Sequence, residues 1–533
     1  MPKITVDGKI IECKDRQMVL QACNDAGYAI PQYCYHPGLS IVASCRICLV
    51  EVEGIPKLVP ACQTPVRDGM VVHSKSPKSV ANQKQVMEYL LINHPLDCPV
   101  CDQAGECHLQ DYSYEYGRSQ SRFEEDKAKK PKKDVGDHIL LYSDRCIMCT
   151  RCVRFTREVS GTSELYVDGR GYREEIDIFP GKPCNNKLAG NVVDLCPVGA
   201  LLDKEFLFKQ RVWLLKSIPS ISPADSGGEN IYLDQNEGKI HRIRPRYNAE
   251  VNTWWISDDT RYSWKNIHSD KRLTRPQRSQ YGSQVEATYG KAAEDAVAGL
   301  REVVAKNGPG SLYALLSPMM ACEEAWLLGK LIRSIDPEAV LISGPAPTTG
   351  HDEIFKNPAN GKQTFVIKAE KVPNAAGVRR VIEMLGGAHA TWEDAIADEP
   401  KPELAKLKGG WIVGGYLSEW IPKKNPKLFS GFKVLQDILA SSLADSASVL
   451  LPAAAWAEKD GCWENHQGKI QVFAAAIPPP EGARREGDVY YRLLGRSGFY
   501  HAESVRKEMG EPFAAVKLPD ANAVEPAFEF VEL

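Results

Sequence analysis

The chain has 533 residues, of which 43 % are hydrophobic and 25 % are charged, and its formal net charge is -3. This is the composition of a multidomain globular protein, and the lack of a basic excess argues against a nucleic-acid partner. The longest apolar runs, such as SVLLPAAAWA, are shorter than the roughly 18 residues that a membrane span requires. The amino terminus, MPKITVDGKIIEC, has no basic region followed by an apolar core. We therefore expect an intracellular protein that contacts a membrane only through partner subunits.

Residues 1–78 contain the signals of a small β-grasp domain. In ITVDGKIIE, two apolar alternations flank Asp7 and Gly8, a dipeptide that favours a tight hairpin turn. QMVLQACNDAG then has apolar residues at helical spacing and ends at Gly27, and LVEVE and KLVPAC are typical of further strands. A hairpin, a helix and returning strands predict an α+β unit of the β-grasp type.

A helix and a short cysteine-rich loop are expected over residues 79–118. VANQKQVMEYLLINHP has a helical apolar face, and Pro95 ends the helix so that His94 faces the loop. The loop NHPLDCPVCDQAGEC supplies Cys98, Cys101 and Cys107. One histidine and three cysteines suit either a structural zinc ion or an iron–sulfur cluster, and the spacing alone does not choose. Residues 119–139 are highly charged, which predicts a solvated linker or a docking strap.

Fourteen of the 16 cysteines precede residue 197, so the metal chemistry is expected in that region. In a long chain without a signal peptide, free thiols are more typical than disulfides. Cys34, Cys45, Cys48 and Cys62 have the spacing C-x10-C-x2-C-x13-C, which is similar in theme to a plant-type 2Fe-2S ferredoxin, although its first gap is longer. Zinc or free thiols are the alternatives for these four residues.

A second pattern lies within residues 140–210, for which we predict a 4Fe-4S ferredoxin-like domain. Cys146, Cys149 and Cys152 form a C-x2-C-x2-C triplet, and Cys196 stands before a proline, as in bacterial 4Fe-4S proteins. Cys184 lies between them, but the Cys-Pro context favours Cys196 as the fourth ligand. Because two such motifs flank it, the simplest interpretation of the loop after His94 is a third cluster site. The remaining cysteines are expected to fill the core: Cys13, Cys23, Cys184, Cys322 and Cys462.

Residues 211–533 change in character. Short strand-like runs (SLYALLSP, AVLISGP, TFVIKA, GGWIVGGYL) alternate with helical stretches such as EEAWLLGKLIRSI and AAGVRRVIEML. This alternation predicts an α/β domain with a mostly parallel sheet. The region contains neither a G-x-G-x-x-G dinucleotide fingerprint nor a P-loop.

Three stretches, NHPLDCPVCDQAGEC, CIMCTRCVRF and GNVVDLCPVGAL, resemble the large iron–sulfur subunit of NADH-quinone oxidoreductase, respiratory complex I. The resemblance implies one 2Fe-2S cluster and two 4Fe-4S clusters. The ligands that it implies are Cys34, Cys45, Cys48 and Cys62 for the 2Fe-2S cluster, His94, Cys98, Cys101 and Cys107 for one 4Fe-4S cluster, and Cys146, Cys149, Cys152 and Cys196 for the other.

The stretch from VLQDILASS to ENHQGKIQ resembles the molybdopterin oxidoreductase superfamily. This resemblance implies that residues 211–533 form a truncated α/β relic that holds no molybdopterin. Some family members carry a further 4Fe-4S cluster at the start of this domain. The positions where its cysteines would stand hold Ser222, Asp225, Glu229 and Ser257. Oxygen ligands are poor substitutes for thiolates, so we expect no cluster there, and we expect the two carboxylates to be exposed or paired with Arg242 and Arg244.

The resemblance implies an electron relay without catalytic residues of its own. Electrons would pass from a flavin- and NADH-binding subunit through the clusters toward quinone, and flavin would bind on another chain. The partners would be that subunit and other peripheral-arm subunits, on the cytoplasmic side of a bacterial inner membrane. The alternatives are an electron-transfer subunit of a soluble NAD-linked hydrogenase or formate dehydrogenase, and a zinc-stapled interaction scaffold.

Overall fold

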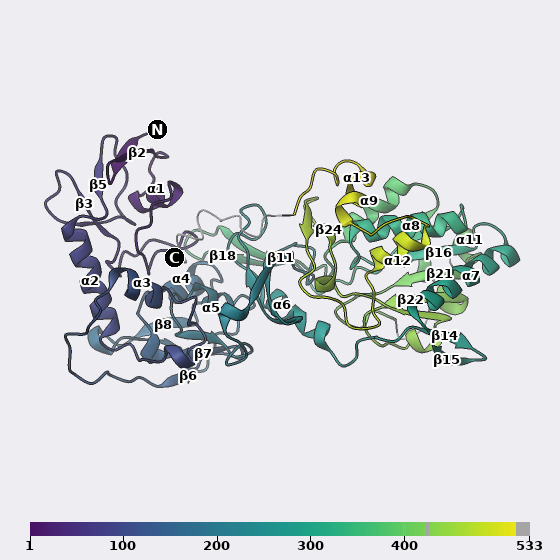
Figure 1. Ribbon diagram of the computed structural model, residues 1–533, viewed down its shortest axis with the longest axis horizontal. Coiled ribbons are helices and arrows are strands. Elements are labelled where there is room, and N and C mark those ends of the chain that lie inside the picture. Colours follow the sequence, from purple (N-terminus) through teal and green to yellow (C-terminus); the bar gives the residue numbers. More distant parts are fainter. Residues whose placement is uncertain (398, 400, 423–425, 519–533) are drawn as a thin grey trace.

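The computed structural model describes residues 1–397, 399, 401–422 and 426–518. The molecule is elongated, with the cysteine-rich amino-terminal region at one end and an α/β domain at the other (Figure 1). A small antiparallel sheet lies between the two ends. Residues 519–533 of the predicted 211–533 domain lie outside the described part of the chain.

The first region is a five-stranded sheet, in the order β2-β1-β5-β3-β4, that packs against one helix. Asp7 (φ 46°) and Gly8 (φ 87°) form the turn of the first hairpin, as their residue types predict. Strands β1 and β5 pair in parallel, which with the single helix gives the predicted β-grasp arrangement. The elements are β1 (Lys3–Val6), β2 (Lys9–Glu12), α1 (Val19–Asp25), β3 (Leu49–Val52), β4 (Val59–Pro60) and β5 (Val71–His73).

The predicted helix before His94 is confirmed as α2 (Pro77–Leu91), but it ends three residues before His94 rather than at Pro95. Ser76 caps its amino terminus by accepting from the Ser79 backbone N–H. The charged segment that follows α3 (His108–Tyr116) returns along α2. There, Arg122 makes a bidentate contact with Glu88, and Lys127 donates to the carbonyl oxygens of Leu91 and Ile92. The prediction of a linker over the whole of 119–139 is wrong at its end, because β6 (Lys132–Asp134) pairs with β7 (Ile139–Tyr142).

The rest of the cysteine-rich region is built from short elements around one core. Sheet β10-β7-β6 packs with two helices, and a two-stranded ribbon lies beside them. The elements are α4 (Arg151–Glu158), β8 (Leu165–Asp168), β9 (Glu175–Ile178), α5 (Asn191–Leu195) and β10 (Leu201–Asp203). Cys146, Cys149 and Cys196 lie outside the helices and strands, whereas Cys152 lies in the first turn of α4.

An antiparallel sheet, β11-β12-β13, opens the region that the sequence assigns to an α/β domain. Its core side includes Ile231 and Leu233 of β12 and Ile240 and Ile243 of β13, and the sheet lies in the middle of the molecule beside α6 (Figure 1). Residues 211–270 are therefore not part of the parallel sheet. The elements are β11 (Lys216–Ile221), β12 (Asn230–Asn236), β13 (Lys239–Pro245) and α6 (Asp258–Arg261).

The predicted parallel sheet is confirmed. Eight strands have the order β15-β14-β23-β22-β21-β16-β17-β20, of which the last six are parallel. The strands are β14 (Gln277–Gln280), β15 (Ser283–Glu286), β16 (Leu312–Leu316), β17 (Val340–Ser343), β20 (His389–Ala390), β21 (Gly409–Val413), β22 (Phe432–Asp437) and β23 (Val449–Pro452). The helices are α7 (Tyr289–Asn307), α8 (Cys322–Ile335), α9 (Ala375–Leu385), α10 (Trp392–Ile396), α11 (Pro402–Ala405), α12 (Glu486–Leu493) and α13 (Ala502–Met509), and β24 (Gly461–Glu464) pairs with β25 (Ile470–Phe473).

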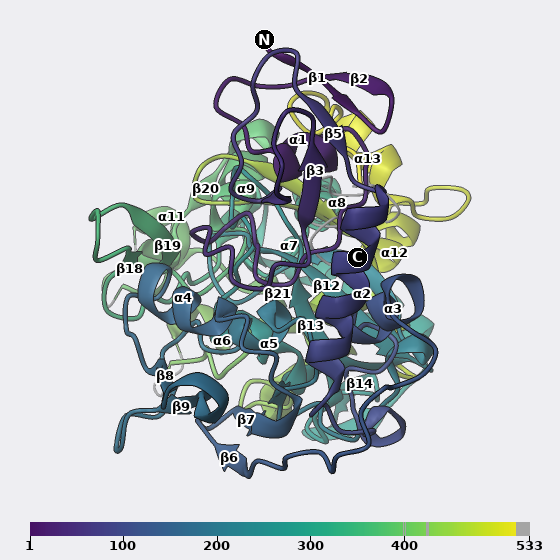
Figure 2. The same cartoon turned by 90° about the vertical axis from the view of Figure 1, so that its left-hand side faces the viewer.

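The run TFVIKA is a strand, as predicted, but it does not join the parallel sheet. It forms β19 (Gln363–Ile367), which pairs with β18 (Glu353–Lys356) in an antiparallel ribbon. The ribbon lies beside α4 of the cysteine-rich region (Figure 2). Phe365 and Ile367 are buried in the core of that region, and the Thr364 hydroxyl donates to the carbonyl oxygen of Val159 at 2.6 Å. The ribbon thus joins the two ends of the molecule.

We expect Phe365→Ala to lower the free energy of unfolding of the cysteine-rich region by about 3 kcal/mol, because it leaves a cavity in that core. Chemical denaturation followed by tryptophan fluorescence and limited proteolysis would measure the loss. Ile354→Ala is the matched control, since Ile354 lies on the partner strand and is 53 % exposed. An equal loss in both variants would contradict the proposed docking of the ribbon.

Candidate metal centres

The first predicted ligand set lies on loops of the β-grasp sheet. Cys34, Cys48 and Cys62 are buried and Cys45 is half-buried. Arg46, between the paired cysteines, has a left-handed backbone (φ 59°), which turns the C-x2-C segment tightly. The thiols of Cys34 and Cys45 are hydrogen-bonded, as are those of Cys48 and Cys62, and the first of these bonds lowers the pKa of Cys34. The fold therefore brings the four thiols together.

The second set surrounds a single pocket at the amino terminus of α4. Cys146, Cys149, Cys152 and Cys196 all line it, and its other walls are mostly apolar side chains. Burial raises the pKa of Cys146 to about 12 and that of Cys149 to about 11. The remaining lining residues are Leu141, Ile147, Thr150, Arg151, Ile176, Val198, Ala200 and Leu201.

Cys184 does not line this pocket. It is 1 % exposed and packs in the core, and its backbone N–H donates to the carbonyl oxygen of Val135 at 2.7 Å. Cys196, in contrast, follows α5 directly. Burial raises the pKa of the Cys196 thiol, and the backbone N–H groups of Val198, Leu201 and Ala200 oppose part of that rise. Cys196, and not Cys184, therefore shares a pocket with the Cys146 triplet.

The third set, in the loop after α2, is the most open. Cys101 and Cys107 are buried, whereas Cys98 is exposed. Burial, with the charges of Arg145 and Lys127, lowers the pKa of His94 to about 4, so its imidazole is neutral at physiological pH, as a metal ligand requires. Among the residues that the structure describes, no three His, Cys, Asp or Glu side chains form a ligand group for a single metal ion.

The polar group at the start of the middle sheet differs from what the sequence predicts. Ser222, Asp225, Glu229 and Ser257 are all buried. Ser257 donates to Glu229 through its backbone N–H at 3.0 Å and its hydroxyl at 2.9 Å, and Asp225 accepts from the backbone N–H groups of Gly227 and Lys368. The prediction that these carboxylates are exposed or paired with arginines is wrong. Both are buried, and their hydrogen bonds come from backbone N–H groups and a hydroxyl group.

Arg242 and Arg244 have a different partner. Both lie on β13 and contact Asp234 on the neighbouring strand β12, at 2.7 and 2.8 Å. Arg242 also makes a bidentate contact with Glu106, which ties the middle sheet to the loop that carries Cys107. These arginines are thus occupied by acidic groups other than Asp225 and Glu229.

Burial raises the pKa of Glu229 to about 8, and the nearby Asp225 carboxylate adds to the rise. Burial also raises the pKa of Asp225, to about 6. A carboxyl group with a pKa of about 8, as at Glu229, holds its proton at neutral pH. The site therefore consists of hydroxyl and carboxyl groups that satisfy one another, with no thiol for an iron–sulfur cluster.

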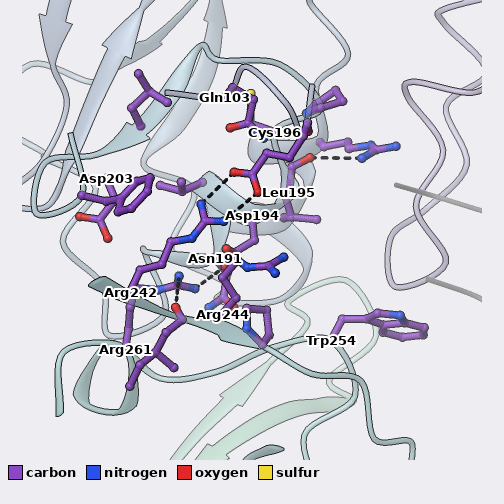
Figure 3. A pocket seen from close by; sticks show the side chains of 18 of the residues that line it. Gln103, Asn191, Asp194, Leu195, Cys196, Asp203, Arg242, Arg244, Trp254 and Arg261 are labelled. Carbon is purple, nitrogen blue, oxygen red and sulfur yellow. Dashed lines mark hydrogen bonds and ion pairs between the residues drawn. The ribbon is translucent and has the colours of Figure 1, made fainter. Parts of the chain in front are cut away.

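A polar cavity lies where the middle sheet meets the cysteine-rich region (Figure 3). Its walls carry charges of both signs that pair across it, such as Arg261 with Asp194 and Arg242 with Glu106. Cys196 lies on its wall. The labelled residues of this cavity are Gln103, Asn191, Asp194, Leu195, Cys196, Asp203, Arg242, Arg244, Trp254 and Arg261.

The parallel sheet has a switch point between β16 and β21, where open α/β sheets bind ligands beyond the strand ends. Here, side chains of the chain itself fill that position. Met319 follows β16, Tyr416 follows β21, and both pack with Val372 and Ala375 in a buried cluster. The Tyr416 hydroxyl donates to the carbonyl oxygen of Pro345 at 2.8 Å.

Cys322 and Cys462, both expected to fill the core, are neighbours. Both are fully buried and their thiols are hydrogen-bonded. Sequence reasoning also missed three buried arginines beside the predicted ligands: Arg145, Arg151 and Arg154. Their only signal in the sequence is that Arg145 and Arg151 directly precede Cys146 and Cys152. Within residues 1–397, 399, 401–422 and 426–518, no helix has the length and apolar character of a membrane span.

The fold and these sites define an iron–sulfur protein with ferredoxin-like units. Family models match five parts of the chain. They are "2Fe-2S iron-sulfur cluster binding domain" (residues 2–77), "NADH-ubiquinone oxidoreductase-G iron-sulfur binding region" (83–122), "NADH-quinone oxidoreductase subunit 3, ferredoxin-like domain" (136–202), "NADH-ubiquinone oxidoreductase NDSU1/NuoG-like, 4Fe-4S domain" (215–265) and "Molybdopterin oxidoreductase" (416–496).

The chain is 39 % identical to the G-type subunit of NADH-quinone oxidoreductase from Rickettsia conorii, over 93 % of this chain and 87 % of the relative. It is 40 % identical to the NADH-ubiquinone oxidoreductase 75 kDa subunit of Reclinomonas americana, over 65 % of this chain and 50 % of that protein. It is 45 % identical to the mitochondrial 78 kDa subunit of Neurospora crassa, over 54 % of this chain and 39 % of that protein. The last two alignments thus span half or less of those relatives.

The chain belongs to the family of the large iron–sulfur subunit of NADH-quinone oxidoreductase, the G-type or 75 kDa subunit. A crystal structure of an NAD⁺-reducing [NiFe]-hydrogenase also overlaps with 40 % of this chain and 91 % of that chain, at 29 % identity and a TM-score of 0.37. That score is too low to support a structural argument.

The raised pKa of Glu229 predicts a pH dependence of stability. The pKa of Glu229 in the folded chain lies above that of an unfolded glutamate, about 4.3. The free energy of unfolding should therefore fall as the pH rises from about 5 to about 8. Glu229→Gln should remove that part of the fall and make the chain about 5 kcal/mol more stable than the wild type at pH 8. Denaturation midpoints across this range provide the measurement. Glu250→Gln, at an exposed position, is the control, and parallel curves for the wild type and Glu229→Gln would refute the prediction.

Proposed function

We propose that this chain relays electrons from a flavin-bearing NADH dehydrogenase subunit toward a quinone-reducing module. One observation carries the proposal: three sets of cysteines, one of them with a histidine, lie on adjoining loops at one end of the molecule. The second and third sets adjoin, since Cys107 and Cys196 are close enough for their charges to interact. Clusters that close together in a buried region can exchange single electrons without a substrate site.

The proposed ligands are those of the three predicted sets. Cys34, Cys45, Cys48 and Cys62 would hold a 2Fe-2S cluster, and the grouping of their thiols supports this. Two 4Fe-4S clusters would be held by His94, Cys98, Cys101 and Cys107, and by Cys146, Cys149, Cys152 and Cys196. The chain would fold in units over 1–78, 79–118, 140–210 and 211–533, with a charged strap that begins at residue 119 and ends where β6 begins, at Lys132.

The chain's own residues prepare these sites in two ways. Apolar side chains form most of the wall of the pocket that Cys146, Cys149, Cys152 and Cys196 line. Backbone N–H groups face the sulfurs, as Met148 does toward Cys146 at 3.4 Å. When bound, iron–sulfur clusters supply the one-electron chemistry, and such hydrogen bonds tune their potentials.

We propose no further cofactor on this chain. The group formed by Ser222, Asp225, Glu229 and Ser257 is satisfied internally, and the switch point that would face a pterin is filled by Met319 and Tyr416. NADH, flavin and quinone would bind on partner subunits of the peripheral arm. The chain would be a peripheral protein on the cytoplasmic side of a bacterial inner membrane, in contact with lipid only through its partners.

Elemental analysis tests the number of clusters. One binuclear and two cubane centres give about ten iron atoms, and a similar amount of acid-labile sulfide, per chain. A fourth cluster in residues 215–265 would raise both to about fourteen. Zinc without labile sulfide would end the electron-transfer proposal, and molybdenum would favour a formate dehydrogenase subunit.

Two serine variants test the choice of the fourth ligand. Cys196→Ser should cost the cubane of the Cys146 triplet, about four iron atoms per chain, because it removes one corner ligand. Cys184→Ser should leave the iron content unchanged, since Cys184 lies outside the pocket and its thiol packs only in the core. Iron content and low-temperature spectra of both variants provide the measurement. The reverse pattern would show that the ligand is assigned wrongly.

A further inference from the structure

Arg154 joins the loop of the 2Fe-2S site to the loop of the Cys146 triplet. Its side chain is buried, and one terminal nitrogen donates to the carbonyl oxygens of both Cys34 and Cys149, the second at 3.2 Å. Its other terminal nitrogen donates to the carbonyl oxygen of Ser40. One guanidinium group thus contacts two proposed cluster ligands that are more than a hundred residues apart in the sequence.

Arg151, one helical turn earlier on α4, spans the same junction. It donates to the carbonyl oxygen of Tyr35 at 2.7 Å and to that of Leu195 at 3.2 Å. Tyr35 and Leu195 are the direct neighbours of Cys34 and Cys196. Arg151 also lines the pocket formed by the second cysteine set.

Arg145 joins the two proposed cubane sites. It directly precedes Cys146, and it contacts Asp97, the residue before Cys98, at 2.7 and 3.0 Å. It also donates to the carbonyl oxygen of Gly199, at 3.4 Å. Gly199 lies so close to the thiol of Cys101 that a Cβ atom there would be 2.2 Å from the sulfur.

Neither Arg151 nor Arg154 forms an ion pair within the described residues, although the charge of Glu158, which pairs with Arg157, reaches Arg154. Every hydrogen bond of these two side chains in the described residues ends on a backbone carbonyl oxygen, and the Nε–H of each is buried without an acceptor. An unpaired buried charge is costly, so such a site calls for negative charge nearby. Thiolate-bound iron–sulfur clusters would supply that charge on both sides of each guanidinium.

We infer that Arg145, Arg151 and Arg154 are positioning residues that hold neighbouring cluster sites in register and raise the reduction potentials of the two clusters at each junction. This inference rests on the ligands proposed above. Reduction adds a negative charge to a cluster. A fixed positive charge in a region of low dielectric constant stabilises the reduced form more than the oxidised form. Each arginine should therefore act on its own pair of clusters.

EPR-monitored redox titration of the full-length chain, purified with its clusters, tests this pairing. Arg154→Gln should lower the midpoint potentials of the 2Fe-2S cluster and the Cys146-type cubane, and leave the His94-type cubane unchanged. Arg145→Gln should lower both cubane potentials and leave the 2Fe-2S potential unchanged. Arg157→Gln is the matched control, because Arg157 lies on the same helix but is 59 % exposed, and it should shift none of the three.

If Arg154→Gln loses its clusters, Arg154→Lys tests the same effect on the two potentials. Lysine keeps the charge but lacks the planar fork that reaches both carbonyl groups, so it should lower the same two potentials by less. Unchanged potentials in a variant that retains its clusters, or equal shifts in all three clusters, would overturn the inference. A wild-type chain without labile sulfide would instead refute the proposed ligands, so the two failures can be distinguished.

Discussion

Burial of thiols is the constraint on which the cysteine-rich region depends. Desolvation raises the pKa of Cys107 to about 12, as it does for Cys146, and that of Cys149 to about 11. Without compensation these side chains are neutral thiols, which are poor ligands. Bound iron would shift them to thiolates, so cluster assembly and the folding of these loops should be coupled. The buried guanidinium groups of Arg151 and Arg154 favour the same charge state.

The rest of the architecture supports this region from outside. The β18–β19 ribbon inserts Phe365 into its core, and Arg242 of the middle sheet binds Glu106 beside Cys107. Residues 215–265 match a 4Fe-4S family model, but the group of Ser222, Asp225, Glu229 and Ser257 there contains no thiol. Hydroxyl and carboxyl groups there satisfy one another by hydrogen bonds, and Glu229 can remain buried because it is protonated at neutral pH. Buried thiols at the proposed cluster sites need bound iron to become thiolates, whereas the buried carboxyl group of Glu229 avoids a buried charge by keeping its proton.

Local signals in the sequence predict local structure well. Asp7 and Gly8 indicated the first hairpin, the apolar face before Pro95 indicated α2, and alternating strands and helices indicated the parallel sheet. The spacing of the triplet and the Cys-Pro pair selected four residues that line one pocket. Each of these signals arises from residues that act on their own neighbours in the chain.

Features that depend on contacts between residues far apart in the sequence could not be predicted from it. TFVIKA has the β-branched and aromatic residues of a strand, but its partner β18 and its docking on α4 are decided by tertiary packing. Asp225 and Glu229 were expected to be exposed or paired with arginines because carboxylates are rarely buried without a partner, and nothing in the sequence shows the donors that surround them. Arg154 meets Cys34 across 120 positions, a contact that no local pattern records.

The central claim, that the chain is a conductor with three clusters, is tested most directly by low-temperature EPR of the dithionite-reduced full-length protein. The account predicts one slowly relaxing signal from a 2Fe-2S centre, visible at higher temperature, and two rapidly relaxing signals from 4Fe-4S centres, each near one spin per chain. Spectra without iron–sulfur signals, or with a third 4Fe-4S signal, would contradict it.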